Sequence, residues 1–147
     1  MSYVSLSDEE TKVIFAEEAA TYFAALDASE QEEVITRLLN IVTSEAPPSS
    51  FIYECIANLD IITVGDQCRL YTKVVDEIPR GDTEYHVIYL FFIDPYHDYP
   101  HKTLAAYSPS AEAKAEEVTA LEQVSDVEQY FADHDALDED DLRDLLP

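Results

Sequence analysis

The sequence predicts an α+β domain, because two helical patterns are followed by three strand patterns and then by a second helical region. Residues 59–64, 68–75 and 85–93 are rich in β-branched and aromatic side chains, as strands are. With 147 residues, of which 47% are hydrophobic, the chain can bury one core of its own. We therefore expect an N-terminal helical hairpin packed on a small antiparallel β-meander.

The helical hairpin is predicted to follow a short strand at residues 3–6. Ser7 and Glu10 have the spacing of a capping box, and Ser29 and Glu32 repeat it. Behind each box apolar residues recur every three or four positions, which is typical of the buried face of a helix. These residues are Phe15, Ala19, Tyr22, Phe23 and Leu26 in the first helix and Val34, Ile35, Leu38, Leu39 and Val42 in the second.

The meander begins after Pro47 and Pro48, which end the second helix because proline lacks the backbone N–H. Residues 65–67, Gly-Asp-Gln, form a plausible tight turn between the first two strands. A longer connection that contains Pro79 and Gly81 is expected between the second strand and the third. Strands joined in this way are antiparallel neighbours.

The C-terminal region differs from the rest because its strand signal disappears. Residues 111–147 contain thirteen Asp and Glu residues against Lys114 and Arg143, and their apolar residues have helical spacing. Such helices must pack on this domain or on a partner. We expect two parts, an α+β domain over residues 1–107 and an acidic amphipathic helical tail over residues 108–147.

The net charge of −24 is extreme for a chain of this size. Self-repulsion opposes folding in dilute buffer, whereas about 1 M salt shortens the Debye length to about 3 Å. The composition therefore resembles that of proteins from halophilic archaea, although an acidic surface with a function of its own is an alternative.

The expected compartment is the cytoplasm. No basic segment followed by an apolar run opens the chain, and no run of about 18 apolar residues occurs, so neither secretion nor a membrane partner is expected. Cys55 and Cys68 read as two small buried residues in a reducing interior rather than as a disulfide or a metal pair.

Scarce cationic groups gather in residues 68–102, which hold four of the eight Lys and Arg residues and three of the four His residues. Side chains on a strand alternate between two faces, so Arg69, Tyr71 and Lys73 share one face. Arg69 and Lys73 are then about 13 Å apart, which suits two positions along a nucleic-acid backbone, and Tyr71 can stack on a base. Alternatively, the two cations are solvated and pair with acids such as Glu54, Asp60 or Glu84.

The segment after the third strand contains groups that can transfer a proton near neutral pH. Tyr96, His97 and Tyr99 are such groups, and Lys102 adds a cation. A metal site at His97 and His101 is a rival interpretation, but the spacing matches no known motif. A third interpretation is an aromatic loop that covers the edge of the sheet. His86 and His134 receive no role.

The order of elements and two short motifs resemble the RelE/ParE-like toxin superfamily of toxin–antitoxin systems. Residues 65–71, Gly-Asp-Gln-Cys-Arg-Leu-Tyr, match a strand motif of that superfamily, and residues 87–93 followed by Tyr96, His97 and Tyr99 match its last strand. The resemblance covers residues 3–102.

The resemblance implies an endoribonuclease that cleaves messenger RNA at the ribosome without metal or other cofactor, using the ribose 2′-hydroxyl as nucleophile. Arg69 would stabilise the charge on the phosphate, and His97 or Tyr99 would protonate the leaving oxygen. Tyr71, Lys73, Tyr96 and Lys102 would bind substrate. An antitoxin protein is an implied partner.

Two features depart from this pattern. Residues 85–94 contain no Arg or Lys, although active ribonucleases of the superfamily usually have cations there, and the acidic tail lies outside the pattern. A non-catalytic ParE-like module, which binds a ribosome or another protein through the sheet face and the tail, is therefore the alternative. A tail that folds over the sheet face and blocks the site is a further hypothesis.

Overall fold

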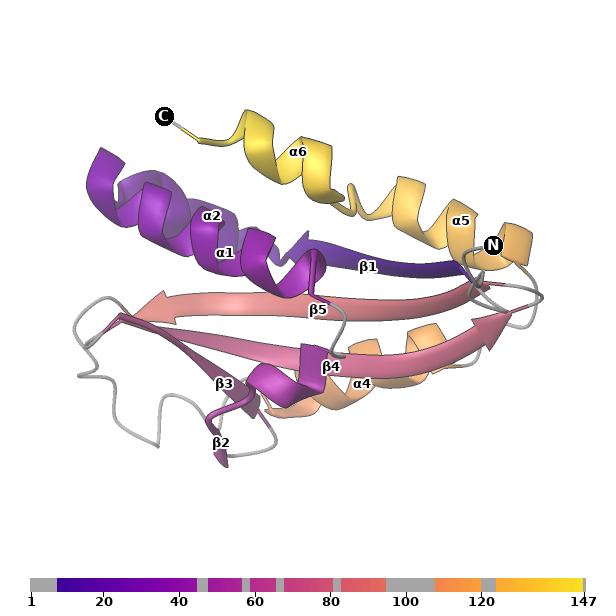
Figure 1. Cartoon of the computed structure of the whole chain (residues 1–147). Helices are drawn as coiled ribbons and strands as arrows, with labels where there is room; N and C mark the ends of the chain where they lie inside the picture. The colour runs from indigo at the N-terminus through magenta and orange to yellow at the C-terminus, as the bar shows by residue number, and fades with distance from the viewer. Residues whose placement is uncertain are drawn as a thin grey trace.

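The computed structural model describes residues 8–44, 48–56, 59–65, 68–80, 83–94, 108–119 and 124–146. It contains a five-stranded sheet of order β1-β5-β4-β3-β2 with helices on both faces, so the predicted α+β class is confirmed (Figure 1). The strands are β1 (Asp8–Phe15), β2 (Glu54–Ile56), β3 (Leu59–Val64), β4 (Cys68–Arg80) and β5 (Thr83–Asp94). The helices are α1 (Glu17–Ala25), α2 (Ala28–Val42), the 3-10 helix η1 (Pro48–Phe51), α4 (Ser108–Thr119), α5 (Val124–Asp133) and α6 (Glu139–Asp144).

In the sheet, β1 lies beside β5, although the two strands are far apart in the sequence. β2, β3, β4 and β5 pair with their chain neighbours in antiparallel fashion, whereas β1 pairs with β5 in parallel, from Asp8 opposite Thr83 to Phe15 opposite Leu90. The chain returns from β1 to the sheet through α1 and α2. Among the strands that the structure describes, the first in the chain is therefore the neighbour of the last.

The first described element differs from the sequence prediction. A helix was expected directly behind Ser7, but residues 8–15 form β1 and helix α1 begins at Glu17. Val13 and its neighbour Ile14 are both buried and belong to core clusters on opposite sides of the sheet, as strand alternation requires. The strand predicted at residues 3–6 lies outside the described residues.

The second predicted capping box is displaced by two residues. The Asp27 carboxylate accepts the Glu30 N–H at 2.8 Å, and the Glu30 carboxylate accepts the Asp27 N–H at 3.0 Å. Helix α2 therefore begins at Ala28. Asp27 and Glu30 form the reciprocal capping box that the sequence predicts at Ser29 and Glu32. Its predicted apolar stripe is buried except for Val42, which is half-buried.

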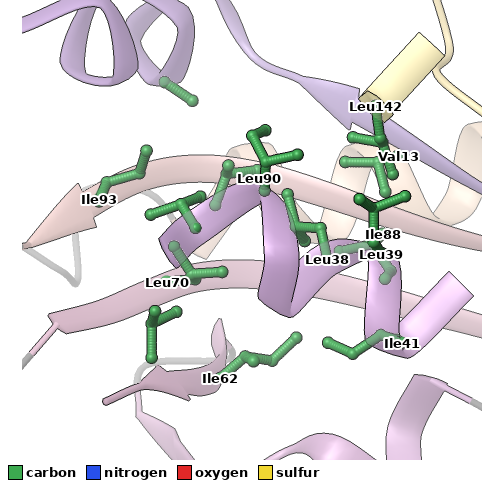
Figure 2. Close-up of a cluster of buried hydrophobic side chains, with 14 residues drawn as sticks. Val13, Leu38, Leu39, Ile41, Ile62, Leu70, Ile88, Leu90, Ile93 and Leu142 are labelled. Carbon is green, nitrogen blue, oxygen red and sulfur yellow. The ribbon is translucent and has the colours of Figure 1, made fainter. Parts of the chain in front are cut away.

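The two faces of the sheet carry separate halves of the core. Figure 2 shows the first half, a cluster to which α2 contributes Leu38, β4 contributes Leu70 and β5 contributes Leu90. The second half lies on the opposite face of the sheet. It contains Tyr71 of β4, Tyr85 and Val87 of β5, and Val127, Tyr130 and Phe131 of α5. A register shift between β4 and β5 places Phe91 and Phe92 in this second half together.

The segment from α5 to α6 wraps around β1. Val127 and Phe131 of α5 are buried on one face of the sheet, and Leu142 of α6 is buried on the other. Between them the Leu137 N–H donates to the Val13 carbonyl at 2.7 Å, and the Val13 N–H donates to the Leu137 carbonyl at 2.9 Å. The described part of residues 108–147 thus shares the core of the sheet.

Strand β4 is longer than predicted. The connection expected at Pro79 is wrong, because β4 continues through Pro79 to Arg80, with a register shift between Val75 and Ile78. Proline is tolerated where a strand lacks a ladder partner on one side, and β3 pairs with the opposite end of β4, Cys68 to Thr72. Strands β4 and β5 therefore pair along most of their length, from Arg69 opposite Asp94 to Arg80 opposite Thr83.

Candidate functional site

Strand β4 presents its polar residues as alternation requires. Leu70 packs in the core half next to α2, whereas Tyr71 and Val75 lie in the opposite half. Arg69 and Lys73, which share the Tyr71 face, are both half-buried. The predicted row of three residues therefore exists, but its members differ in exposure.

Tyr71 cannot stack on a base as the sequence suggested. Its side chain is 2% exposed, and its ring stacks on Phe92 with the centroids 4.5 Å apart. Burial raises the pKa of the Tyr71 phenol to about 12, and the nearby charge of Asp94 acts in the same direction. The sequence interpretation of Tyr71 is wrong because the ring is buried against Phe92 of β5 in the core on this face of the sheet.

Arg69 lies at the end of the sheet and is held from several sides. Its register partner on β5 is Asp94, which is fully buried. The Arg69 guanidinium donates through Nη1 to the Cys68 carbonyl at 3.2 Å, and its Cζ lies 5.8 Å from the centroid of the Tyr53 ring. A buried carboxylate requires compensation by positive charge or hydrogen bonds, so we infer that Arg69 offsets the charge of Asp94.

The electrostatics near Arg69 are balanced rather than strongly positive. Asp94 and Glu54 both raise the pKa of Tyr71, whereas Arg69 lowers it, so all three charges lie near that phenol. The sequence allowed pairing of Arg69 and Lys73 with acids as an alternative, and Glu54 was among the acids named but Asp94 was not. Two carboxylates around one guanidinium weaken its attraction for an anion.

Lys73 lies near the outer strand of the sheet. The Cys55 thiol donates to the Asp60 carboxylate at 3.2 Å, which raises the pKa of Cys55, and the charge of Lys73 acts in the opposite direction. The other oxygen of Asp60 accepts the Val74 N–H at 2.8 Å. Asp60 thus fastens β2, β3 and β4 together and supports the strand that carries Lys73.

Tyr53 is a residue that the sequence interpretation missed. Its side chain is 65% exposed, although it lies in the apolar stretch Phe51-Ile52-Tyr53, which reads as core. The Tyr53 N–H donates to the Ile61 carbonyl at 2.7 Å and so extends the pairing of the edge strand β2. We call Tyr53, Glu54, Arg69 and Lys73 the β2–β4 patch.

The remaining predicted site residues, Tyr96, His97, Tyr99 and Lys102, lie outside the described residues, as does His101. Their segment follows Asp94, the last residue of β5 and the register partner of Arg69.

The two histidines that received no role from the sequence, His86 and His134, lie in packed or hydrogen-bonded positions. His86 is buried on β5 opposite Thr11 of β1. The His134 ring stacks on Tyr130 at 4.0 Å between centroids, and its Nδ1 donates to the Tyr130 carbonyl at 2.9 Å. Tyr130 in turn hydrogen-bonds to the Tyr89 hydroxyl and to Glu117 of α4.

Other kinds of site find little support in the part of the chain that the structure describes. Within it, no three His, Cys, Asp or Glu side chains are grouped as a metal ion would require, and no helix is long and apolar enough to cross a membrane. Comparisons with protein-family models, curated proteins and solved structures found no match to this chain.

Proposed function

We propose that this chain is a RelE-like toxin, a metal-independent endoribonuclease that acts on messenger RNA at the ribosome. One observation carries the proposal: Arg69 is the register partner of Asp94, and the segment that contains His97 and Tyr99 begins directly after Asp94. His97 is three residues beyond Asp94, and three residues of chain span at most about 11 Å. The cation proposed for the phosphate thus lies at the end of the sheet where the described part of β5 ends.

The proposed reaction needs no cofactor. The ribose 2′-hydroxyl loses its proton to solvent water and attacks the adjacent phosphorus. The P–O2′ bond forms as the P–O5′ bond breaks, which leaves a 2′,3′-cyclic phosphate on one fragment and a 5′-hydroxyl on the other. Arg69 stabilises the negative charge that develops on the phosphate oxygens, and Lys73 binds a neighbouring phosphate. His97 or Tyr99 gives a proton to the departing 5′-oxygen, with Tyr96 and Lys102 as further substrate contacts.

The element order supports the same proposal. A strand, two helices and a set of antiparallel strands is the order on which the resemblance to RelE-like toxins rests. The same resemblance makes an antitoxin protein a proposed partner, and the charge of −24 favours a salt-rich cytoplasm as the compartment. Both are parts of the proposal.

The test uses Arg69→Lys rather than Arg69→Ala. Removal of the cation would take away a positive charge opposite the buried Asp94, and breaking a buried pair costs about 3–5 kcal/mol, which would confuse loss of activity with loss of fold. Lysine keeps the charge but loses the planar fork that binds phosphate through two hydrogen bonds. Arg143→Lys is the matched control, because Arg143 is exposed on α6 and pairs with Glu139.

We expect Arg69→Lys to lower the rate of cleavage of ribosome-bound message by about 100-fold or more, as loss of an aligned charge-stabilising donor does. Arg143→Lys should cleave like the wild type. Urea denaturation of both variants checks that the fold is intact. Equal cleavage by the two variants would overturn the role of Arg69.

A second candidate is a non-catalytic ParE-like or ribosome-binding module that uses the sheet face and the acidic tail. Two observations favour it: Tyr71 is buried, and Asp94 and Glu54 offset the charge of Arg69. This module would sediment with ribosomes, or form a stable complex with another protein, and leave the message intact. Cleavage by the purified wild type would exclude it.

A further inference from the structure

Tyr53 is unusual among the large hydrophobic residues that the structure describes. Its side chain is 65% exposed, and the next most exposed of that set, Leu145, is 37% exposed. A solvated aromatic ring gives up the transfer free energy that burial would release. A single exposed side chain is ordinary by itself, so the significance of Tyr53 depends on what lies beside its ring.

The Tyr53 ring is positioned rather than loose. Its backbone is fixed by the hydrogen bond to the Ile61 carbonyl, and the Arg69 guanidinium lies 5.8 Å from the ring centroid, within the range of a cation–π contact. These two contacts come from β3 and β4, which are paired with each other in the sheet. The ring is thus presented beside a cation on a preformed surface.

A nearby Arg–aromatic pair shows what a structural contact looks like in this protein. The Arg37 guanidinium lies 5.3 Å from the Phe51 ring centroid, but Phe51 packs against the core and Arg37 Nε donates to the Thr63 carbonyl at 3.0 Å. Tyr53 differs because its ring is mostly in solvent. Packing therefore accounts for the first pair and does not account for the second.

We propose that Tyr53 is the base-stacking residue of the β2–β4 patch, in the place that the sequence assigned to Tyr71. The ligand is single-stranded RNA: an unpaired base stacks on the Tyr53 ring, and phosphates on either side of it bind Arg69 and Lys73. The inference rests on the RNA-binding part of the proposed function. It assigns the substrate contact that the buried Tyr71 cannot make.

Salt makes an aromatic contact necessary for such a ligand. At about 1 M salt the Debye length is about 3 Å, so binding of phosphates through charge alone becomes weak. A protein with a net charge of −24 also repels a polyanion at low salt. Base stacking depends on ring contact, so it can hold RNA where screened charges do not.

The test measures binding of fluorescein-labelled oligoadenylate of about 12 nucleotides, a length within the usual range of single-strand sites. Fluorescence anisotropy is recorded in about 2 M KCl, where long-range charge effects are screened. An abasic oligomer of the same length, with the phosphates but without the bases, is the second probe. The variants are Tyr53→Leu, which removes the ring, and Tyr53→Phe, which keeps it.

We expect Tyr53→Leu to weaken oligoadenylate binding by about 5- to 150-fold, the range for loss of one stacked base. Tyr53→Phe should bind like the wild type, and neither variant should change binding of the abasic oligomer. Because the side chain is mostly exposed, both variants should fold, and their urea midpoints check this.

Equal oligoadenylate affinity for Tyr53→Leu and the wild type would overturn the inference. A wild type that binds no oligoadenylate would overturn it too, and would leave the Tyr53–Arg69 pair as a contact for a protein partner. If stacking is found but the wild type leaves ribosome-bound message intact, the stacking site stands and the nuclease proposal fails. If the wild type cleaves message and Tyr53→Leu binds normally, the nuclease proposal stands and the stacking site fails.

Discussion

Replacement of Leu142 by Ala measures whether α6 belongs to the folding unit of the sheet. Leu142 is 0% exposed and lies in the core cluster with Val13 of β1 and Ile88 of β5. A buried Leu→Ala change costs about 2.7–5.0 kcal/mol, through the lost transfer free energy and the cavity that remains. We expect a loss of about 3 kcal/mol in the free energy of unfolding, which lowers Tm by about 6–12 °C for a chain of this size.

Leu145→Ala is the matched control, since it removes the same atoms three residues later. Leu145 is 37% exposed, so we expect its replacement to cost well under half as much, about 1 kcal/mol or less. Urea denaturation in about 2 M KCl, where charge repulsion is screened, gives both values from the midpoint and slope. Equal losses for the two variants would refute the reasoning and indicate that α6 is not packed on the sheet.

The same packing changes how the tail can be tested for autoinhibition. Deletion of residues 111–147 would remove Val127, Phe131 and Leu142 from the core and Leu137 from the edge of β1. Loss of function after such a deletion would report unfolding rather than regulation. Point substitutions on exposed positions of α4 avoid this difficulty.

Two further predictions concern solution conditions. The urea midpoint should rise as KCl is raised from about 0.1 M to about 2 M. The reason is that the Debye length falls from about 10 Å to below about 3 Å, so the charge of −24 is screened. An unchanged midpoint would contradict the halophilic interpretation. Burial raises the pKa of Tyr71 and of Tyr130 to about 12, above the ordinary value of about 10. As the pH rises, these tyrosines therefore ionise in the unfolded chain before they ionise in the folded one. The stability that they contribute is complete below about pH 10 and should be lost between about pH 10 and 12. Urea midpoints against pH check this, Tyr130→Phe should reduce the slope, and a flat profile to pH 12 would argue against burial of these phenols.

Strands with their own local signal could be predicted from the sequence. Residues 59–64 match β3, and residues 85–93 fall within β5, because β-branched and aromatic residues dominate both. Strand β1 could not be predicted, because its first four residues, Asp-Glu-Glu-Thr, look like the first turn of a helix. Its conformation depends on β5 and Leu137, which lie far away in the sequence.

The site shows the same division between local and distant causes. The period of two predicts that Arg69 and Lys73 share a face of β4. It does not predict that Tyr71, between them, is buried against Phe92 of β5. Nor does it predict that Tyr53 is exposed or that Asp94 lies opposite Arg69, because both follow from the strand order and register of the whole sheet.

The position of β1 between β5 and Leu137 constrains how the protein is completed during synthesis. β1 leaves the ribosome before the other strands that the structure describes, but its pairing partner begins at Thr83 and the bridge on its other edge forms at Leu137. Until residue 137 has emerged, one edge of β1 lacks the hydrogen bonds that Val13 makes to Leu137 in the finished fold. A ribosome that stalls earlier therefore releases a chain with an open strand edge, which is the kind of surface that chaperones bind and proteases attack.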